Sequence, residues 1–430
     1  MHTKFARRGA ALIVGFALVG SACGSSGGSK SKTGALQGFK GTTPLVKLGD
    51  DFKNKLKAVD PNLKDYNYAA ETYDAIVIIA LAAEEAKTDG VEYASKIIGI
   101  TKGGEKCTDF KACDALVKAG KDIDYDGVSG PIEFNGNGEP LQASYGVQIM
   151  DAKNRIDDAK TTFKLAKAAA SAAVPDVKVE GTRKGDGQLK IGSILPQTGS
   201  LAFLGPPEFA AFDLAIKDIN DAGGVLGKPV LASKGDSGDA TTDTVNQTTD
   251  RLIGENVDAI IGAASSGVSL KVIDKITGAG IVQFSPANTS DKLSTYADKG
   301  LYFRTAPPDV LQGGVIADIV NADGNKNVAI IARNDAYGTG LAGVVSKGVT
   351  DGGGKVVVQK IYDEKAEKFN TEVNEIKAAK PDAIVVIGFD ESSKILATMV
   401  EAGVGPKKIK VYGCDGNIGN ALGENFDAGK

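Results

Sequence analysis

The chain has 430 residues, with a hydrophobic content of 42% and a charged content of 24%, ordinary values for a globular protein of about two or three domains. Its formal net charge of −4 and its pI near 5.4 argue against a nucleic-acid-binding protein, because such proteins present basic surfaces. The only histidine is His2, so the rest of the chain has no imidazole for a Ser-His-Asp or Cys-His mechanism or for His-ligated zinc. We therefore expect no enzymatic activity, no cofactor and no metal site.

The amino-terminal residues have the pattern of an export signal. Basic residues precede an apolar run at residues 10–19 that is too short to span a bilayer comfortably, which predicts a signal peptide over residues 1–22. The letters GSAC, ending at Cys23, resemble the lipobox of bacterial lipoproteins, which implies lipidation of Cys23 and an extracytoplasmic, membrane-anchored protein. Gly20 stands where that motif usually has an aliphatic residue, and an ordinary secretory signal is the alternative. Residues 23–43 are expected to form a Gly- and Ser-rich tether and the start of a crossover.

The next part of the chain, residues 44–152, contains elements that do not complete a sheet of their own. A long helix is predicted over residues 66–86, hairpin chemistry lies in the Asn-Gly pairs of residues 127–140, and a short strand follows over residues 144–150. Residues 153–186 are rich in Ala, Lys and Asp and lack a clear apolar face after Leu165, so we expect a partly helical or disordered linker there.

The cysteines fit an exported protein. Cys107 and Cys113, in CTDFKAC, have a spacing that suits a small disulfide-closed loop but neither a CxxC redox pair nor a zinc ribbon, and two free thiols are the alternative. Cys414 stands alone and is expected to be buried.

From residue 187 onward, short apolar runs alternate with helical patterns, which predicts an α/β fold with parallel sheets. The plan occurs twice: VDAIIG at residues 257–262 is echoed by DAIVVIG at residues 382–388, and each strand opens into a polar loop. We therefore expect two lobes built on one plan, with main parts at residues 187–307 and 308–430, and a crossover near YFRTAPP.

With these elements in hand, the chain resembles the type I periplasmic binding proteins of ABC importers, and within them the branched-chain amino acid (leucine/isoleucine/valine) group. The resemblance is carried by the motifs KIGSILPQTGSLAFLGPPE, DAIIGAASSG, VQFSPANTS, YFRTAPPD, NDAYGTGLA and YAAETYDA. It implies two Rossmann-like lobes with parallel central sheets, joined by crossover strands, with the ligand cleft between them.

The order of the segments departs from that family. Residues 34–152 carry the elements that the family places last, so the chain looks circularly permuted, either naturally or by engineering. On this interpretation residues 44–126 are the closing part of lobe 1, and residues 127–152 are the closing part of lobe 2. In the unpermuted order, the tail at residues 420–430 would be followed directly by residues 34–45. A separate, damaged copy in residues 34–160 is the alternative, and a protein of that kind should bind poorly.

The residues themselves suggest where a zwitterionic ligand would bind. Ser265 and Ser266 come before a helix, where a hydroxyl and exposed backbone N–H groups suit a carboxylate, although a simple helix cap fits the same pattern. Asp415 follows a strand, where an acid would face the cleft, although a loop aspartate in a turn is the alternative.

The resemblance adds roles to these and other positions. It implies that Ser266 and Thr289 hold a carboxylate, that the Ala287 carbonyl and Asp415 hold an ammonium group, and that Tyr337 caps the ligand as the lobes close. We further expect a cavity wall from the residues Tyr68, Phe389 and Leu204, the last of which stands near a position where the family often has an aromatic residue.

These observations predict a monomeric receptor that binds a small amino acid, branched-chain or related, by lobe closure and delivers it to a membrane ABC permease. A sensor of the same fold, or a binder of amides, urea or short carboxylates, is the alternative. GTGLAG at residues 338–343 matches a dinucleotide-binding pattern formally, but it follows its strand only after a polar interval and lacks a clearly placed acidic partner.

Overall fold

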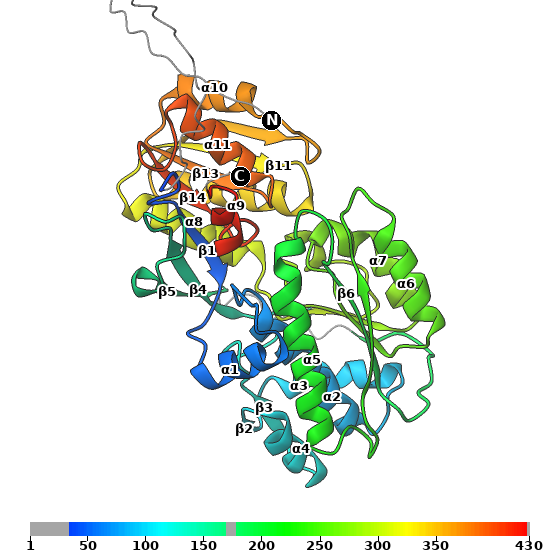
Figure 1. The fold of residues 1–430 in the computed structure, drawn as a ribbon. Helices are drawn as coiled ribbons and strands as arrows, with labels where there is room; N and C mark the ends of the chain where they lie inside the picture. The colour runs from blue at the N-terminus through cyan, green and yellow to red at the C-terminus, as the bar shows by residue number, and fades with distance from the viewer. Residues whose placement is uncertain (1–33, 169–177, 428–430) are drawn as a thin grey trace, which may run out of the picture.

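A computed structural model describes residues 34–168 and 178–427, which form two α/β lobes around two large sheets, with a third, two-stranded sheet formed by β2 (Glu105–Cys107) and β3 (Ile123–Tyr125) (Figure 1). The predicted signal peptide and Cys23 lie outside the described residues. Among the residues that are described, no helix combines the length and the apolar character needed to cross a membrane.

Lobe 1 is built on a five-stranded, all-parallel sheet with the order β10-β9-β8-β6-β7. Its strands are β6 (Lys190–Leu195), β7 (Leu231–Asp236), β8 (Ala259–Gly262), β9 (Val282–Ser285) and β10 (Tyr302–Arg304). Between them run α5 (Gly205–Asp221), α6 (Thr244–Gly254) and α7 (Ser266–Gly278), with the short 3-10 turns η3 (Ala202–Leu204) and η4 (Asp291–Leu293). Every residue of the central strands β8 and β9 is buried because both faces of the sheet are covered.

The early part of the chain completes lobe 1 on one side. It supplies α1 (Asp50–Val59), α2 (Ala69–Ala86), η1 (Val91–Lys96), α3 (Ile97–Ile100), β2 (Glu105–Cys107), α4 (Phe110–Lys118) and β3 (Ile123–Tyr125). Almost every residue of α2 is buried, because the helix packs between other elements of the lobe, and a helix that is apolar all round belongs in such a place. The predicted disulfide between Cys107 and Cys113 is present and ties β2 to the first turn of α4.

Lobe 2 is built on a seven-stranded mixed sheet with the order β12-β11-β13-β14-β1-β4-β5. The strands are β11 (Asn327–Arg333), β12 (Lys355–Tyr362), β13 (Ala383–Ile387), β14 (Lys410–Gly413), β1 (Lys40–Pro44), β4 (Gln142–Ile149) and β5 (Thr162–Lys167). Its helical elements are α8 (Asp309–Ala322), α9 (Ala336–Asp351), α10 (Asn370–Ala379), α11 (Ser392–Ala402), α12 (Asn420–Glu424) and η2 (Asp158–Lys160).

The first described strand lies in the middle of this second sheet. β1 pairs in parallel with β14, with Lys40 opposite Tyr412, and antiparallel with β4 (Figure 1). The Leu36 N–H donates to Asn154 Oδ1 at 3.0 Å. Within the segment predicted as a tether and the start of a crossover, residues 40–43 belong to a strand of the lobe 2 core, and Thr42 and Thr43 are buried.

The predicted linker over residues 153–186 is also structured where it is described. β5 adds an edge strand antiparallel to β4, and Phe163 and Leu165 on it are 44% and 64% exposed. Because an edge strand with both faces near solvent needs no apolar side, the sequence pattern gave no sign of it.

The last part of the same segment is docked on lobe 1. The carboxylate of Asp89 accepts backbone N–H bonds from Asp186, Gly187 and Gln188 at 3.0–3.1 Å. The Arg183 guanidinium pairs with the buried Asp258 carboxylate at 2.6 Å. Charge pairing and backbone hydrogen bonds, rather than apolar burial, thus hold residues 183–188 in place.

The boundary predicted at residue 127 between the closing parts of the two lobes is displaced. The buried Asp74 carboxylate of α2 accepts hydrogen bonds from the Val128 and Ser129 N–H groups at 3.0 and 2.7 Å, and Phe134 packs against Phe284 of lobe 1. Residues 127–134 therefore remain with lobe 1, because Asp74 needs donors for its buried oxygens. The chain enters the sheet of lobe 2 only at β4.

Candidate ligand-binding site

A small cavity of about 10 Å³ lies between the lobes and is lined by predicted site residues from distant parts of the chain. Its lining is made by Tyr68, Leu201, Leu204, Ala264, Ser266, Ala287, Thr289, Tyr337, Phe389, Asp415 and Gly416. Every predicted ligand-binding residue except Ser265 is in this set.

Ser265 and Ser266 have different tasks at the start of α7. Ser265 is the N-cap residue, and its Oγ accepts the Val268 N–H at 3.4 Å. Ser266 Oγ accepts the N–H groups of Thr289 and Ser290, each at 3.3 Å. Its hydroxyl hydrogen thus remains available for a ligand. Ser265 does not line the cavity, because its side chain turns back to cap the helix.

The loop after β9 presents Ala287 and Thr289 to the cavity and is held rigidly from behind. The buried Asn288 amide donates to the carbonyls of Ala263 and Ala264 at 2.9 and 2.8 Å. Its Oδ1 accepts the Tyr302 hydroxyl at 3.0 Å. A side-chain amide satisfied in this way fixes the loop, so hydroxyl and backbone groups face the cavity in a set arrangement.

Asp415 is the charged group of the cavity and follows β14 in lobe 2. It is 4% exposed, and its two carboxylate oxygens accept the hydroxyls of Tyr68 at 2.5 Å and Tyr337 at 2.7 Å. Burial raises the pKa of Asp415, while the tyrosine hydroxyls act in the opposite direction. Because no basic side chain lines the cavity, this acid has no protein cation as a partner there.

Two aromatic rings form the wall beside Asp415. Tyr337, in the first turn of α9, stacks on Phe389 with ring centroids 5.4 Å apart and an interplanar angle of 21°. Gly416 leaves space for them: a Cβ atom there would lie 2.7 Å from the Gly388 carbonyl oxygen and 2.8 Å from the Phe389 ring. Any residue larger than glycine at position 416 would clash with the Gly388 carbonyl or displace the Phe389 ring.

The two lobes touch across the cleft. The Tyr68 hydroxyl of lobe 1 reaches Asp415 of lobe 2, and the Ser290 hydroxyl donates to the Ala336 carbonyl at 2.8 Å. The Asp390 N–H donates to the Ser200 carbonyl at 3.2 Å. These bonds join opposite walls of the cavity, so the structure is that of closed lobes.

Three lining residues, Leu201, Ala264 and Gly416, were not predicted. Leu201 shares a loop with Leu204, and Gly416 directly follows Asp415, so sequence proximity was the available signal. Tyr68 has a left-handed backbone with φ of 61°, a conformation that costs energy for a residue with a side chain. Nothing in its sequence context indicates that conformation, which aims the phenol from the start of α2 into the cleft.

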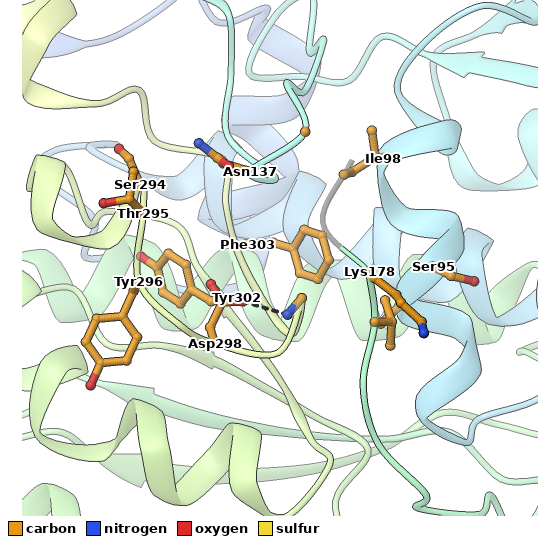
Figure 2. Close-up of a pocket in the computed structure, with 14 residues that line it drawn as sticks. Ser95, Ile98, Asn137, Lys178, Ser294, Thr295, Tyr296, Asp298, Tyr302 and Phe303 are labelled. Atoms are coloured by element: carbon orange, nitrogen blue, oxygen red, sulfur yellow. Dashed lines mark hydrogen bonds between the residues drawn. The ribbon is translucent and has the colours of Figure 1, made fainter. Parts of the chain in front are cut away.

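A larger cavity of about 490 Å³ lies in lobe 1 and is lined by other residues (Figure 2). Two of its polar groups have partners: the Asp298 carboxylate accepts the Gly300 N–H at 2.7 Å, and the Tyr302 hydroxyl donates to Asn288. None of the predicted site residues lines it. Across residues 34–168 and 178–427, no group of His, Cys, Asp and Glu side chains could hold a metal ion.

Comparison with known proteins identifies the family. Residues 188–428 match the model of a family described as "Periplasmic binding protein", and residues 28–152 match one described as "Receptor family ligand binding region". Because the first match covers more than half of the chain, the chain belongs to the periplasmic binding protein family. This family comprises solute-binding receptors rather than enzymes and implies an extracytoplasmic location.

Individual relatives agree with this assignment. The chain is 27% identical over 213 residues to Leu/Ile/Val-binding protein homolog 3 of Brucella melitensis, covering 49% of this chain and 56% of that protein. It is 24% identical over 259 residues to Leu/Ile/Val-binding protein homolog 7 of Brucella abortus, covering 58% and 63%. The chain thus matches less than two thirds of the length of these relatives.

A solved structure supports the fold directly. The branched-chain amino acid transporter substrate-binding protein of Streptococcus pneumoniae, in complex with isoleucine, has a TM-score of 0.50 and 27% sequence identity. The match covers 56% of this chain and 67% of that protein. The predicted α/β fold with parallel-sheet lobes of the type I class is confirmed.

Proposed function

We propose that the chain binds a small aliphatic amino acid between its lobes and delivers it to an ABC permease. The observation that carries this proposal is that one cavity has a carboxylate on one side and hydroxyl groups on the other. Asp415 offers a buried negative charge without a protein cation, and Ser266 and Thr289 offer hydroxyls on the other side. A zwitterion satisfies both sides: its ammonium group neutralises Asp415, and its carboxylate accepts hydrogen bonds from the serine and threonine.

The charge of Asp415 also separates ligand classes. A plain carboxylic acid would place its negative charge near a buried carboxylate without neutralising it, which is unfavourable. The apolar lining from Leu201, Leu204 and Phe389 then favours an aliphatic side chain over a polar one. The free volume of about 10 Å³ means that the lobes must part to admit a ligand.

Delivery and anchoring belong to the same proposal. We infer that lipidation of Cys23 holds the receptor at the membrane and that the permease recognises the closed lobes. The chain's relatives include proteins named as Leu/Ile/Val-binding proteins and as a transporter substrate-binding protein, which supports this role. A tether of this kind raises the concentration of the receptor near its permease.

Titration calorimetry of the purified chain tests the ligand class. Aliphatic amino acids are expected to bind saturably, and their deaminated analogues, which lack the ammonium group, should not bind. Amides, urea and short carboxylates complete the series. If a folded protein bound a carboxylate as well as its amino acid, or bound no amino acid at all, the proposed ligand class would be wrong.

We also propose that the order of segments is a circular permutation of the family's order. The parallel pairing of β1 with β14 supports it, because the last strand of the main part of lobe 2 then continues naturally into the first described strand. A rebuilt chain, with residues 178–430 followed by residues 34–168, should give the same circular dichroism spectrum and the same ligand Kd. A rebuilt chain that fails to fold would contradict the permutation.

A further inference from the structure

Beyond the cavity lining, lobe 2 contains a buried guanidinium directly behind the aromatic wall. Arg333, the last residue of β11, is 4% exposed and does not line the cavity. Its guanidinium carbon lies 3.9 Å from the centroid of the Phe389 ring. Because Phe389 also stacks on Tyr337, a column runs from the guanidinium through two rings to the hydroxyl that binds Asp415.

Three carboxylates hold the guanidinium in this position. It donates to Asp335 at 2.6 Å, to Glu391 at 2.8 Å and to Glu364 at 3.1 Å. A guanidinium held by three carboxylates stays over the Phe389 ring, whereas an ammonium group on a flexible stem could not make the same set of bonds.

Two of these carboxylates also fix the backbone that carries the rings. The other oxygen of Asp335 accepts the Gly338 N–H at 2.7 Å and so caps α9 next to Tyr337. Glu391 Oε1 accepts the Phe389 N–H at 3.1 Å. The same arginine therefore touches one ring directly and positions the backbone of both.

We infer that Arg333 is a positioning residue for the ligand site: it holds the Phe389–Tyr337 wall in register with Asp415 without touching the ligand. The inference rests on the proposed ligand site at this cavity. A general contribution to stability would not depend on the Phe389 ring. The positioning role does, because Arg333 would affect ligand affinity only through that ring.

A double-mutant cycle tests this role. Arg333→Lys keeps the charge but not the planar stack, and we expect it to weaken ligand binding about tenfold, mainly through faster dissociation. In the Phe389→Leu background, where the ring is absent, the same change should cost less than about twofold. Arg155→Lys is the matched control, because Arg155 forms an ion pair with Asp427 in lobe 2 outside the cavity and should leave the Kd unchanged.

The outcomes separate the inference from the proposed function. An unchanged Kd in Arg333→Lys, or the same loss in both backgrounds, would overturn the positioning role. If the wild-type chain binds no amino acid, the proposed function fails, and hydrogen exchange still tests Arg333. The Phe389 and Gly338 amides should then exchange about tenfold faster in Arg333→Lys than in wild type, and equal exchange rates would overturn the inference.

Discussion

The two faces of the cleft present different chemistry to the cavity. Lobe 1 presents neutral groups, the hydroxyls of Ser266 and Thr289 and the backbone around Ala287, fixed by the satisfied amide of Asn288. Lobe 2 presents one charge, Asp415, beside stacked rings. On the lobe 1 face the free energy of ligand binding would be shared among several hydrogen bonds, whereas on the lobe 2 face it would depend on one buried charge. The lobe 2 face should therefore be far more sensitive to substitution.

The largest effect is expected from Asp415→Asn. The substitution keeps the shape of the side chain and removes the charge that the ligand ammonium needs. We expect calorimetry to show amino-acid affinity reduced by at least about 100-fold, since losing one partner of a buried charge pair is costly. The ligand-free protein should retain its thermal midpoint, because burial already disfavours the charged form of Asp415. Unchanged affinity would mean that the ammonium group binds elsewhere.

The acidic limb of the binding curve follows from the same residue. On the proposed function, the ligand ammonium binds the ionised form of Asp415, whose pKa is raised above its ordinary value of 3.8 by burial. Below that pKa, protonation competes with the ligand, and affinity should fall by up to about tenfold per pH unit. Titrations across the acidic range should show this fall in wild type, and any residual binding by Asp415→Asn should lack it.

A smaller effect is expected on the lobe 1 face from Ser266→Ala. The change removes one hydroxyl donor to the ligand carboxylate while Thr289 and the backbone remain. We expect affinity to fall about tenfold, the usual cost of one hydrogen bond to a charged group. A calorimetric titration measures the loss, and a loss as large as that of Asp415→Asn would contradict the difference between the two faces.

The neighbouring serine is the matched control for that change. Ser265→Ala removes the N-cap of α7 but no cavity group, so it should cost about 1 kcal/mol of stability and leave the Kd nearly unchanged. Chemical denaturation measures the first quantity and titration the second. A large affinity loss in Ser265→Ala would show that Ser265 contributes to ligand binding.

The smallest effect on binding, but a clear one on stability, is expected from Glu71→Gln in lobe 1. Burial raises the pKa of Glu71 from 4.5 to about 8, and nearby Glu208 is buried with both oxygens unpartnered in the described structure. The folded state therefore keeps a proton that the unfolded state releases, and the free energy of unfolding should fall as pH rises from about 4.5 to about 8.

Denaturant titrations at pH 5 and pH 8 measure this slope. Glu71→Gln should flatten it and raise stability at pH 8 by roughly 1 kcal/mol or more. The Kd should not change, because Glu71 does not line the cavity. Part of the slope should remain, because burial also raises the pKa of Glu208. An undiminished slope in Glu71→Gln would assign the linked proton to another group, such as Glu208, or Asp74 or Asp258, whose pKa values burial raises to about 6.

Much of this arrangement was predictable because regular elements carry local signals. The repeated strand-and-loop pattern at residues 257–262 and 382–388 predicted two similar lobes, since buried parallel strands are continuous apolar runs. Strand ends followed by polar residues led to Ser266 and Asp415, because ligands of open α/β sheets bind at the carboxyl ends of strands. Sequence reasoning failed for β5 and for residues 183–188, which are held by edge pairing and charges rather than by an apolar pattern.

The two-lobed α/β plan, the cysteine pair, Ser266 and Asp415 could be predicted from spacing and composition along short segments, whereas Ala287, Thr289 and Tyr337 were predicted only from the resemblance to the family. Only the tertiary structure decided which of the two adjacent serines faces the cavity, that Tyr68 crosses the cleft to Asp415, and that Arg333 lies behind Phe389. These features depend on side-chain direction and on contacts between residues far apart in the chain, and no local pattern records them.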